Sequence, residues 1–317
     1  MSEQIHDIER LRELQALPLE RKIMITQARI IEWYTRYNGQ VYVSFSGGKD
    51  STVLLDIARK CFPDIPAVFC DTGLEYPEIR EFVKTIDNVT WIKPAKNFKR
   101  VILEHGYPVA SKEISRKVHY ARKGSDWAVK YLTGEALKEG RPSRYCISKR
   151  WLNLVDAPFE VHDYCCYVIK KQPFSKYHKE TKRKPIVATM ATESNLRTQS
   201  WLKSGCNSFD GKKPMSKPLS FWTEQDVLQY LKKFNISYAS VYGEITPIND
   251  SEILTTSGCK RTGCMFCMFG CHLEKEPNRF QTMKETHPKQ YEYMLKPISE
   301  GGLGMKEVLD YIGVPYE

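Results

Sequence analysis

The sequence lacks any uninterrupted apolar run of the length that crosses a membrane, about 18 or more residues. Its first residues, MSEQIHDIERLRELQ, are too acidic and polar for a signal peptide. It also lacks internal repeats and low-complexity tracts, and 41% apolar with 27% charged residues is an ordinary globular composition. We therefore expect a cytoplasmic globular protein with no membrane partner.

Acidic residues are too few to balance the basic ones. Lysine and arginine number 48 against 38 aspartate and glutamate, which gives a net charge of +10. Two basic segments, 115–123 and 170–184, interleave these cations with tyrosine, histidine and phenylalanine. Such mixtures can neutralise phosphates and stack on bases, so the charge indicates nucleic acid or a polyanionic small molecule as a partner. The alternative is a basic surface that is merely solvated.

A disulfide framework is not expected from the ten cysteines of a cytoplasmic chain. Their spacing indicates a metal site instead, because thiolates bind zinc and iron-sulfur clusters. Four of them, Cys259, Cys264, Cys267 and Cys271, crowd into the run CKRTGCMFCMFGC, and two more are adjacent at Cys165 and Cys166. Adjacent cysteines point to opposite faces of a strand, so shared ligation requires a turn or helix there.

Hydrophobic periodicity predicts alternating strands and helices. Strands are expected at 41–45, 66–73, 89–94 and 184–192, and helices at 19–37, 50–60, 76–86, 193–205 and 220–236. The last of these helices has a capping pattern at Thr223 and Asp226. The alternation predicts an α/β fold, a doubly wound parallel sheet that binds ligands at the carboxyl ends of its strands. We expect an N-terminal helical segment at 1–40, a nucleotide-binding domain at 41–249 and a cysteine-rich, metal-binding, helical region at 250–317.

The run SFSGGKDS, residues 44–51, lacks the spacing of a Walker-type phosphate loop, which needs Gly-Lys-Ser/Thr four residues after a glycine. It still joins a strand to a helix through Gly47 and Gly48, where backbone amides can converge on a phosphate. Lys49 adds a positive charge. Asp50 would repel a phosphate unless a cation lay between them, so it indicates bound Mg²⁺. A tight turn without a ligand is the alternative.

SGGKDS after a strand resembles the PP-loop of ATP pyrophosphatases. VFCDTGLEYPEI, ESNLR and KPLSFWTEQDVLQYL resemble the phosphoadenosine-phosphosulfate (PAPS) reductase family of that superfamily, and the resemblance spans about residues 38 to 245. It implies an adenine nucleotide alpha hydrolase-like fold and an adenine nucleotide as ligand. The implied nucleotide-binding residues are Ser44, Ser46, Gly47, Gly48, Lys49, Asp50, Ser51, Asp71, Thr72, Gly73, Glu75 and Arg197. An ion pair with Glu193 is the alternative role for Arg197.

CCYVIKK resembles the paired cysteines of adenylyl-sulfate reductases, in which a [4Fe-4S] cluster is held by Cys-Cys and a distant Cys-x-x-Cys. The resemblance implies Cys165, Cys166, Cys264 and Cys267 as ligands. A wholly local site, formed by Cys259, Cys264, Cys267 and Cys271 and holding zinc, stays open, as does a hybrid with one of the paired cysteines.

Three functions follow from these patterns. The first is activation of an acceptor by ATP with Mg²⁺ for sulfur transfer, with tRNA or DNA as acceptor and a donor such as a cysteine desulfurase. The second is reduction of PAPS or adenylyl sulfate, but the final residues GMKEVLDYIGVPYE contain no cysteine that could serve as nucleophile. The third is a catalytically silent nucleotide-binding module of a modification or defence complex. The sequence does not identify catalytic acid-base residues.

Overall fold

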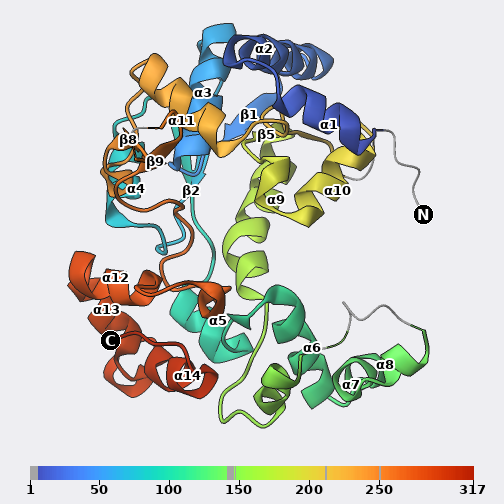
Figure 1. The fold of residues 1–317 in the computed structure, drawn as a ribbon, viewed down its shortest axis with the longest axis vertical. Helices are drawn as coiled ribbons and strands as arrows, with labels where there is room; N and C mark the ends of the chain where they lie inside the picture. Colours follow the sequence, from blue (N-terminus) through green and yellow to red (C-terminus); the bar gives the residue numbers. More distant parts are fainter. Residues whose placement is uncertain (1–5, 141–145, 147, 211–212, 250) are drawn as a thin grey trace. The chain divides into compact units, whose positions relative to one another are not determined.

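The computed structural model describes residues 6–140, 146, 148–210, 213–249 and 251–317 (Figure 1). This part of the chain packs as two compact units. Its first unit comprises the described residues of 6–71, 75–93 and 173–263, and its second unit those of 72–74, 94–172 and 264–317. The three-segment division expected from the sequence stays a prediction.

The first unit is built on a six-stranded sheet. Its order is β3-β2-β1-β5-β7-β6, and every pairing is parallel except that of β6 with β7. The strands are β1 Val41–Ser44, β2 Ala67–Cys70, β3 Val89–Ile92, β5 Lys184–Val187, β6 Asn207–Ser208 and β7 Met215–Ser216. The expected α/β fold with a mainly parallel sheet is confirmed.

Helices cover this sheet, and a small antiparallel hairpin joins them. The helices are α1 Ile8–Gln15, α2 Leu19–Arg36, α3 Lys49–Cys61, α4 Pro77–Lys84, α9 Gln172–Thr181, α10 Asn195–Ser204 and α11 Glu224–Lys233, and the hairpin pairs β8 Ile245–Pro247 with β9 Leu254–Thr256. Local signals account for several ends. Pro77 starts α4, and Thr223 and Asp226 form the expected capping box of α11. Trp33, Leu54 and Trp222 are fully buried in the core between these elements.

The strand expected at 184–192 is shorter than the sequence predicts. β5 ends at Val187, and Ala191–Glu193 form a 3₁₀ turn. The carboxylate of Glu193 accepts a hydrogen bond from the Met190 amide at 2.9 Å, and this bond closes the turn. A side chain that satisfies a backbone amide competes with strand pairing, which explains the early end of β5.

The direction of the strand order reverses at β1. Val43 pairs with Ala67 of β2 on one side and with Ile186 of β5 on the other. The chain proceeds from β1 to β2 and β3 in one direction and returns to place β5 on the opposite side. In open parallel sheets such a switch point leaves a crevice at the carboxyl ends of the strands, where ligands bind. The glycine loop follows β1 at this position.

The second unit is mostly helical. Its helices are α5 Phe98–His105, α6 Lys112–Arg122, α7 Asp126–Thr133, α8 Glu135–Lys138, α12 Arg279–Thr286, α13 Pro288–Leu295 and α14 Met305–Ile312, with a π-helical turn at Tyr167–Lys171. β4 Val109–Ala110 and β10 Met268–Phe269 pair in parallel. Within the described ranges of the whole chain, no helix is both long and apolar enough to span a membrane.

A buried ion pair joins α2 to α11 in the first unit. Lys22 Nζ lies 2.6 Å from Asp226 Oδ2, and the two side chains are 2% and 10% exposed. Asp226 also accepts hydrogen bonds from the backbone amide and hydroxyl of Thr223. Replacing Lys22 would therefore leave a buried carboxylate without its counter-ion.

We expect Lys22→Ala to lower the free energy of unfolding by about 3–5 kcal/mol, the usual cost of an uncompensated buried charge. Urea denaturation measures this loss. Arg21→Ala is the matched control, because Arg21 is the exposed neighbour on the same helix, and it should change stability by no more than about 0.5 kcal/mol. Equal losses in the two variants would show that the pair does not stabilise the α2–α11 contact.

Candidate functional site

The glycine loop is shaped by backbone constraints. Gly47 has φ +72°, and a Cβ there would lie 2.7 Å from methyl carbons of Ile79 and Val83 in α4. Only glycine satisfies both conditions. The hydroxyls of Ser46 and Ser51 lie 3.0 Å apart, and Ser51 Oγ donates to the Gly48 carbonyl at 2.8 Å. The loop thus enters α3 in one defined conformation.

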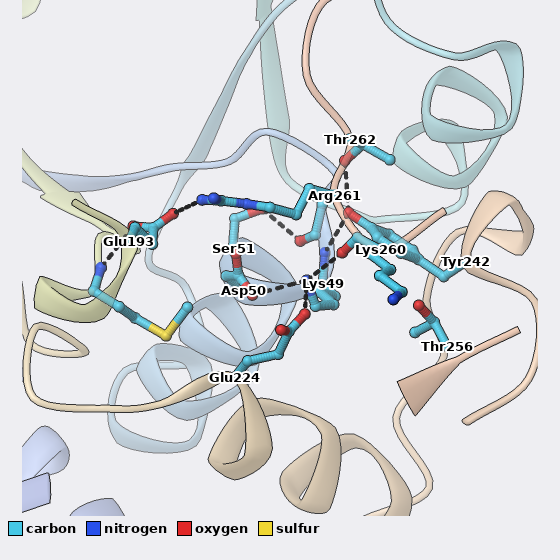
Figure 2. Close-up of polar contacts among 12 residues, drawn as sticks. Lys49, Asp50, Ser51, Glu193, Glu224, Tyr242, Thr256, Lys260, Arg261 and Thr262 are labelled. Carbon is cyan, nitrogen blue, oxygen red and sulfur yellow. Dashed lines mark hydrogen bonds and ion pairs between the residues drawn. The ribbon is translucent and has the colours of Figure 1, made fainter. Parts of the chain in front are cut away.

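Lys49, the first residue of α3, is buried at this loop with 4% of its side chain exposed. Its ammonium donates to the Lys260 carbonyl at 2.9 Å and lies 3.2 Å from a carboxylate oxygen of Glu224. Its backbone amide donates to the Tyr242 hydroxyl at 3.2 Å. Lys49 therefore connects the loop to groups nearly two hundred residues away in the sequence, as Figure 2 shows.

Residues 257–262, here called the covering segment, bring these partners to the loop. The segment follows β9, and the amides of Gly258 and Cys259 donate to the carbonyls of Tyr242 and Val241 at 2.9 Å. The hydroxyls of Tyr242 and Thr262 lie 2.6 Å apart. Burial raises the pKa of Tyr242 to about 12, so its hydroxyl keeps its proton at neutral pH. Hydrogen bonds of both the backbone and the side chains thus hold the covering segment against the loop.

Asp50 adds a carboxylate beside Lys49. One of its oxygens is inaccessible to water and accepts no hydrogen bond from the residues that the structure describes. That oxygen lies 3.7 Å from the Lys49 ammonium. Burial raises the pKa of Asp50, and the charges of Lys49 and Arg261 oppose this effect. A buried oxygen of this kind is suited to a cation, which is what the sequence predicts for Asp50.

Two arginines meet one glutamate on the β5 side of the switch point. Arg261, in the covering segment, lies 2.7 Å from Glu193, and Arg197 of α10 pairs with the same carboxylate (Figure 2 shows Arg261 and Glu193). The predicted Arg197–Glu193 ion pair is therefore present. Burial and the charge of Arg261 lower the pKa of Arg197, whereas Asp50 raises it, so these charges interact electrostatically. Contact of Arg197 with a phosphate stays a prediction.

The remaining predicted nucleotide residues lie at the ends of β1 and β2. Ser44 is the half-buried last residue of β1, and Asp71 follows β2 and pairs with Arg80 at 3.0 Å. Glu75 is half-buried just before α4. Thr72 and Gly73 belong to the second unit, where the Thr72 hydroxyl accepts a bond from the Leu74 amide and Gly73 has φ +73°. Their contact with a nucleotide stays a prediction.

The second unit contains the four cysteines of the preferred predicted set. Cys165 and Cys166 lie in a helical turn, the arrangement that shared ligation requires. The interaction with the Cys166 thiol, burial and the charges of Cys264 and Cys267 raise the pKa of Cys165. The interaction with Cys165 and the nearby Lys112 and Lys170 lower the pKa of Cys166. The four thiols therefore interact electrostatically, and the turn Cys264–Cys267 is closed by a hydrogen bond of 3.1 Å from the Cys267 amide to the Cys264 carbonyl.

The reserve cysteines are engaged differently. The Cys271 thiol is 1% exposed and donates to the Met268 carbonyl at 3.0 Å. Cys259 belongs to the first unit, where burial raises the pKa of its thiol. Among the residues the structure describes, no three cysteine, histidine or acidic side chains converge closely enough to hold a single metal ion.

A model of the phosphoadenosine phosphosulfate reductase domain matches residues 40–126 and 144–269, more than half of the chain. The chain belongs to this family. The match includes the glycine loop, the ends of β1 and β2, Arg197, the covering segment and the four cysteines of the preferred set. Cys271 lies outside it.

Relatives within and beyond this family are distant. An uncharacterized protein of Methanocaldococcus jannaschii is 23% identical over 311 residues, which are 97% of this chain and 59% of that protein. The adenosine 5′-phosphosulfate reductase of Staphylococcus haemolyticus is 25% identical over 224 residues, 69% of this chain and 72% of the reductase. The phosphoadenosine 5′-phosphosulfate reductase of Proteus mirabilis is 25% identical over 222 residues, with the same two coverages. A crystal structure of the Candida auris PAPS reductase has a TM-score of 0.41 at 13% identity, covering 77% of this chain and 97% of that one.

Sequence reasoning missed the residues that surround Lys49 and Glu193. Tyr242, Lys260, Arg261 and Thr262 lie far from the loop in sequence, and Glu224 reads as an ordinary first-turn residue of α11. The run SGCKRTGC contained a signal for part of this set, because Lys260 and Arg261 lie between its two cysteines. Its pairing with the loop is a tertiary contact that spacing does not reveal.

The buried Asp50 predicts a stability effect with a defined pH dependence. Because its pKa is raised in the folded protein, its ionisation at neutral pH opposes folding, and this penalty disappears as the pH falls and the group is protonated. We expect Asp50→Asn to be at least as stable as the wild type at pH 8, with the difference shrinking towards about pH 4. Urea denaturation across this range measures it, with Asp64→Asn as the exposed control. A wild type that is more stable than Asp50→Asn at pH 8 and loses this advantage in acid would contradict the assignment.

Proposed function

We propose that this protein binds ATP with Mg²⁺ at the switch point of its sheet, releases pyrophosphate and adenylates an acceptor for sulfur transfer. The observation that supports this most is the mixture of charges around the glycine loop. Lys49, Arg197 and Arg261 supply cations, and Asp50, Glu193 and Glu224 supply carboxylates in contact with them. Carboxylates beside a phosphate site favour a nucleotide that brings its own divalent cation.

The residues of the loop have separate roles in this proposal. Gly47 and Gly48 let the backbone approach the phosphates, and α3 begins there with its positive dipole end. Lys49 would neutralise negative charge on the leaving pyrophosphate, and the buried Asp50 oxygen that accepts no hydrogen bond from the described residues would bind Mg²⁺. Arg197 and Arg261, which already share Glu193, would contact the remaining phosphate oxygens.

The reaction is a substitution at the α-phosphorus. An oxygen of the acceptor forms a bond to the α-phosphorus. The bond from the α-phosphorus to the oxygen that bridges it to the β-phosphorus breaks, and pyrophosphate leaves with Mg²⁺. The outer sulfur of a persulfide on a donor such as a cysteine desulfurase then attacks the adenylated acceptor, and AMP leaves. A second thiol would attack the remaining S–S bond, so that the sulfur stays on the acceptor and the two thiols form a disulfide. The acceptor that we propose is a nucleic acid, tRNA or DNA, because the chain is strongly basic.

A [4Fe-4S] cluster is part of the proposal. Cys165, Cys166, Cys264 and Cys267 would hold it, because all four belong to the second unit and a cluster of this kind takes four thiolate ligands. Lys112 and Lys170 favour the thiolate form of Cys166 before any metal is bound. When bound, the cluster supplies electron transfer or a site for sulfur. A zinc ion in the local cysteine set is the alternative, and Mg²⁺ would accompany ATP.

Reduction of a sulfonucleotide is the second candidate, favoured by the names of the relatives at 25% identity. A thiolate would attack the sulfur of PAPS or adenylyl sulfate and displace the nucleotide, and thioredoxin would then reduce the product and release sulfite. A cysteine outside the four ligands would have to act as the nucleophile. A silent nucleotide-binding module remains the third hypothesis.

Our first functional prediction concerns nucleotide binding and cleavage. We expect the wild type to bind ATP more tightly with Mg²⁺ and to release pyrophosphate when an acceptor nucleic acid is present. Lys49→Met should weaken ATP binding by about 10- to 150-fold, because a charge-assisted hydrogen bond contributes about 1.5–3 kcal/mol. Asp50→Asn should remove the Mg²⁺ dependence. Calorimetry measures binding, and a coupled phosphate assay measures pyrophosphate.

Lys60→Met is the control, since Lys60 lies on the same helix and pairs with Asp56 away from the loop. Its ATP affinity should match that of the wild type. The proposal fails if ATP binds with no contribution from Mg²⁺ and sulfite forms from adenylyl sulfate without pyrophosphate release from ATP. The silent module is favoured if the protein binds a nucleotide but neither releases pyrophosphate from ATP nor forms sulfite from adenylyl sulfate.

The second functional prediction concerns iron. We expect protein purified without oxygen to contain about four irons and to absorb visible light through thiolate-to-iron charge transfer. Cys166→Ser and Cys267→Ser should lose iron and colour. Cys206→Ser is the matched control, because Cys206 is a buried cysteine of the first unit beside Ser220. The local site would be favoured instead if the wild type is folded and colourless and contains one zinc, and if Cys271→Ser loses that zinc.

A further inference from the structure

A continuous row of aromatic rings crosses the second unit. It runs from Trp127 in α7 to Tyr120 in α6, then through His162 to Tyr164 and Tyr167 at the π-helical turn. Successive ring centroids lie 5.6, 6.4, 5.4 and 5.0 Å apart. We call these five residues the ring row. Trp127, Tyr120 and Tyr167 are 42, 40 and 43% exposed, which is unusual for three rings in contact with others.

The net positive charge of the chain is concentrated in the segment of sequence that contains these five rings. Residues 94–172 carry 16 lysines and arginines against 8 acidic residues, so they hold +8 of the total +10. Exposed cations from this segment accompany the rings in sequence, with Arg116 and Lys123 beside Tyr120 and Lys171 beside Tyr167. Arg116 is partly neutralised by Asp163, whereas Lys123 and Lys171 have no ion-pair partner among the described residues. The surface therefore combines exposed rings with excess positive charge.

We propose that the ring row is a binding surface for single-stranded nucleic acid, including unpaired loops of a folded RNA. Bases stack on exposed aromatic faces, and cations along the row neutralise the phosphates between them. A rigid duplex keeps its bases stacked inside and would not use the rings. An acidic protein would use the charge alone, so the exposed rings favour nucleic acid.

The end of the ring row gives the surface a place in the proposed reaction. Tyr167 directly follows the pair Cys165-Cys166, and Lys112, at the start of the helix that carries Tyr120, lies close enough to Cys166 to interact with its thiol. A strand lying on the row would thus pass beside the cysteines. This role of the strand as acceptor rests on the proposed function, whereas binding itself does not require ATP.

Fluorescence anisotropy of labelled oligonucleotides, measured without ATP or Mg²⁺, tests the proposal. We expect single-stranded RNA or DNA of about 20 nucleotides to bind more tightly than the duplex of the same sequence. Trp127→Ala and Tyr120→Leu should each weaken binding by roughly 5- to 140-fold, the range for loss of one stacked base. Trp127→Phe and Tyr120→Phe keep a ring and should retain most of the affinity. Lys123→Gln should lower the salt slope by about 0.7, the value for one single-strand phosphate.

Tyr293→Ala is the control for a lost ring, because Tyr293 is 39% exposed on α13 outside the row. Comparison of RNA with DNA shows which of the two nucleic acids the ring row binds more tightly, and a preference for either one supports the proposal. Unchanged binding in both Trp127→Ala and Tyr120→Leu would overturn it, as would tighter binding of the duplex or equal competition by polyglutamate. If single strands bind to the ring row but no pyrophosphate is released from ATP, the proposed adenylation is rejected and the binding surface is supported. If pyrophosphate is released but the ring row does not bind single strands, only the binding surface is rejected.

Discussion

The burial of the Lys49 ammonium is the constraint on which the candidate site depends. An ammonium removed from water is costly unless other groups take over its hydration, and here a backbone carbonyl and two carboxylates do so. These partners come from α11, from the covering segment and from α3 itself. The loop, α11 and the covering segment must therefore be in place together. The hairpin β8–β9 provides this positioning, since the covering segment continues directly from β9 and bonds to residues just before β8.

The same contacts define what a nucleotide must displace. The Lys49 amide is one of the donors that a helix N-terminus offers to a phosphate, and the Tyr242 hydroxyl occupies it. The Lys49 ammonium and both arginines are likewise paired with protein oxygens. A phosphate bound at this site would take the place of these internal partners. Nucleotide binding is then expected to loosen the covering segment, which leads within two residues to Cys264.

Charge is distributed unevenly along the chain. Pairs of opposite charge gather around the glycine loop at the switch point of the sheet. Residues 94–172 carry most of the excess positive charge, next to exposed rings and the paired cysteines. A balanced site suits a small ligand with its metal ion, whereas an unbalanced surface suits a long polyanion. The two patterns are consistent with one protein that acts on a nucleotide and a nucleic acid.

Local sequence alone determined the elements and the loop. Alternation of strands and helices, Gly47 and Gly48 after β1, and the capping box at Thr223 depend on neighbours a few residues apart, so their signals survive in the linear chain. The family was predictable for the same reason, as was the requirement of a turn or helix for shared ligation by Cys165 and Cys166. Only the tertiary structure decided that Tyr242, Lys260 and Glu224 close around Lys49 and that Arg261 joins Arg197 at Glu193. These contacts join residues separated by up to 211 positions, and their energy comes from burying paired charges, which no local pattern records.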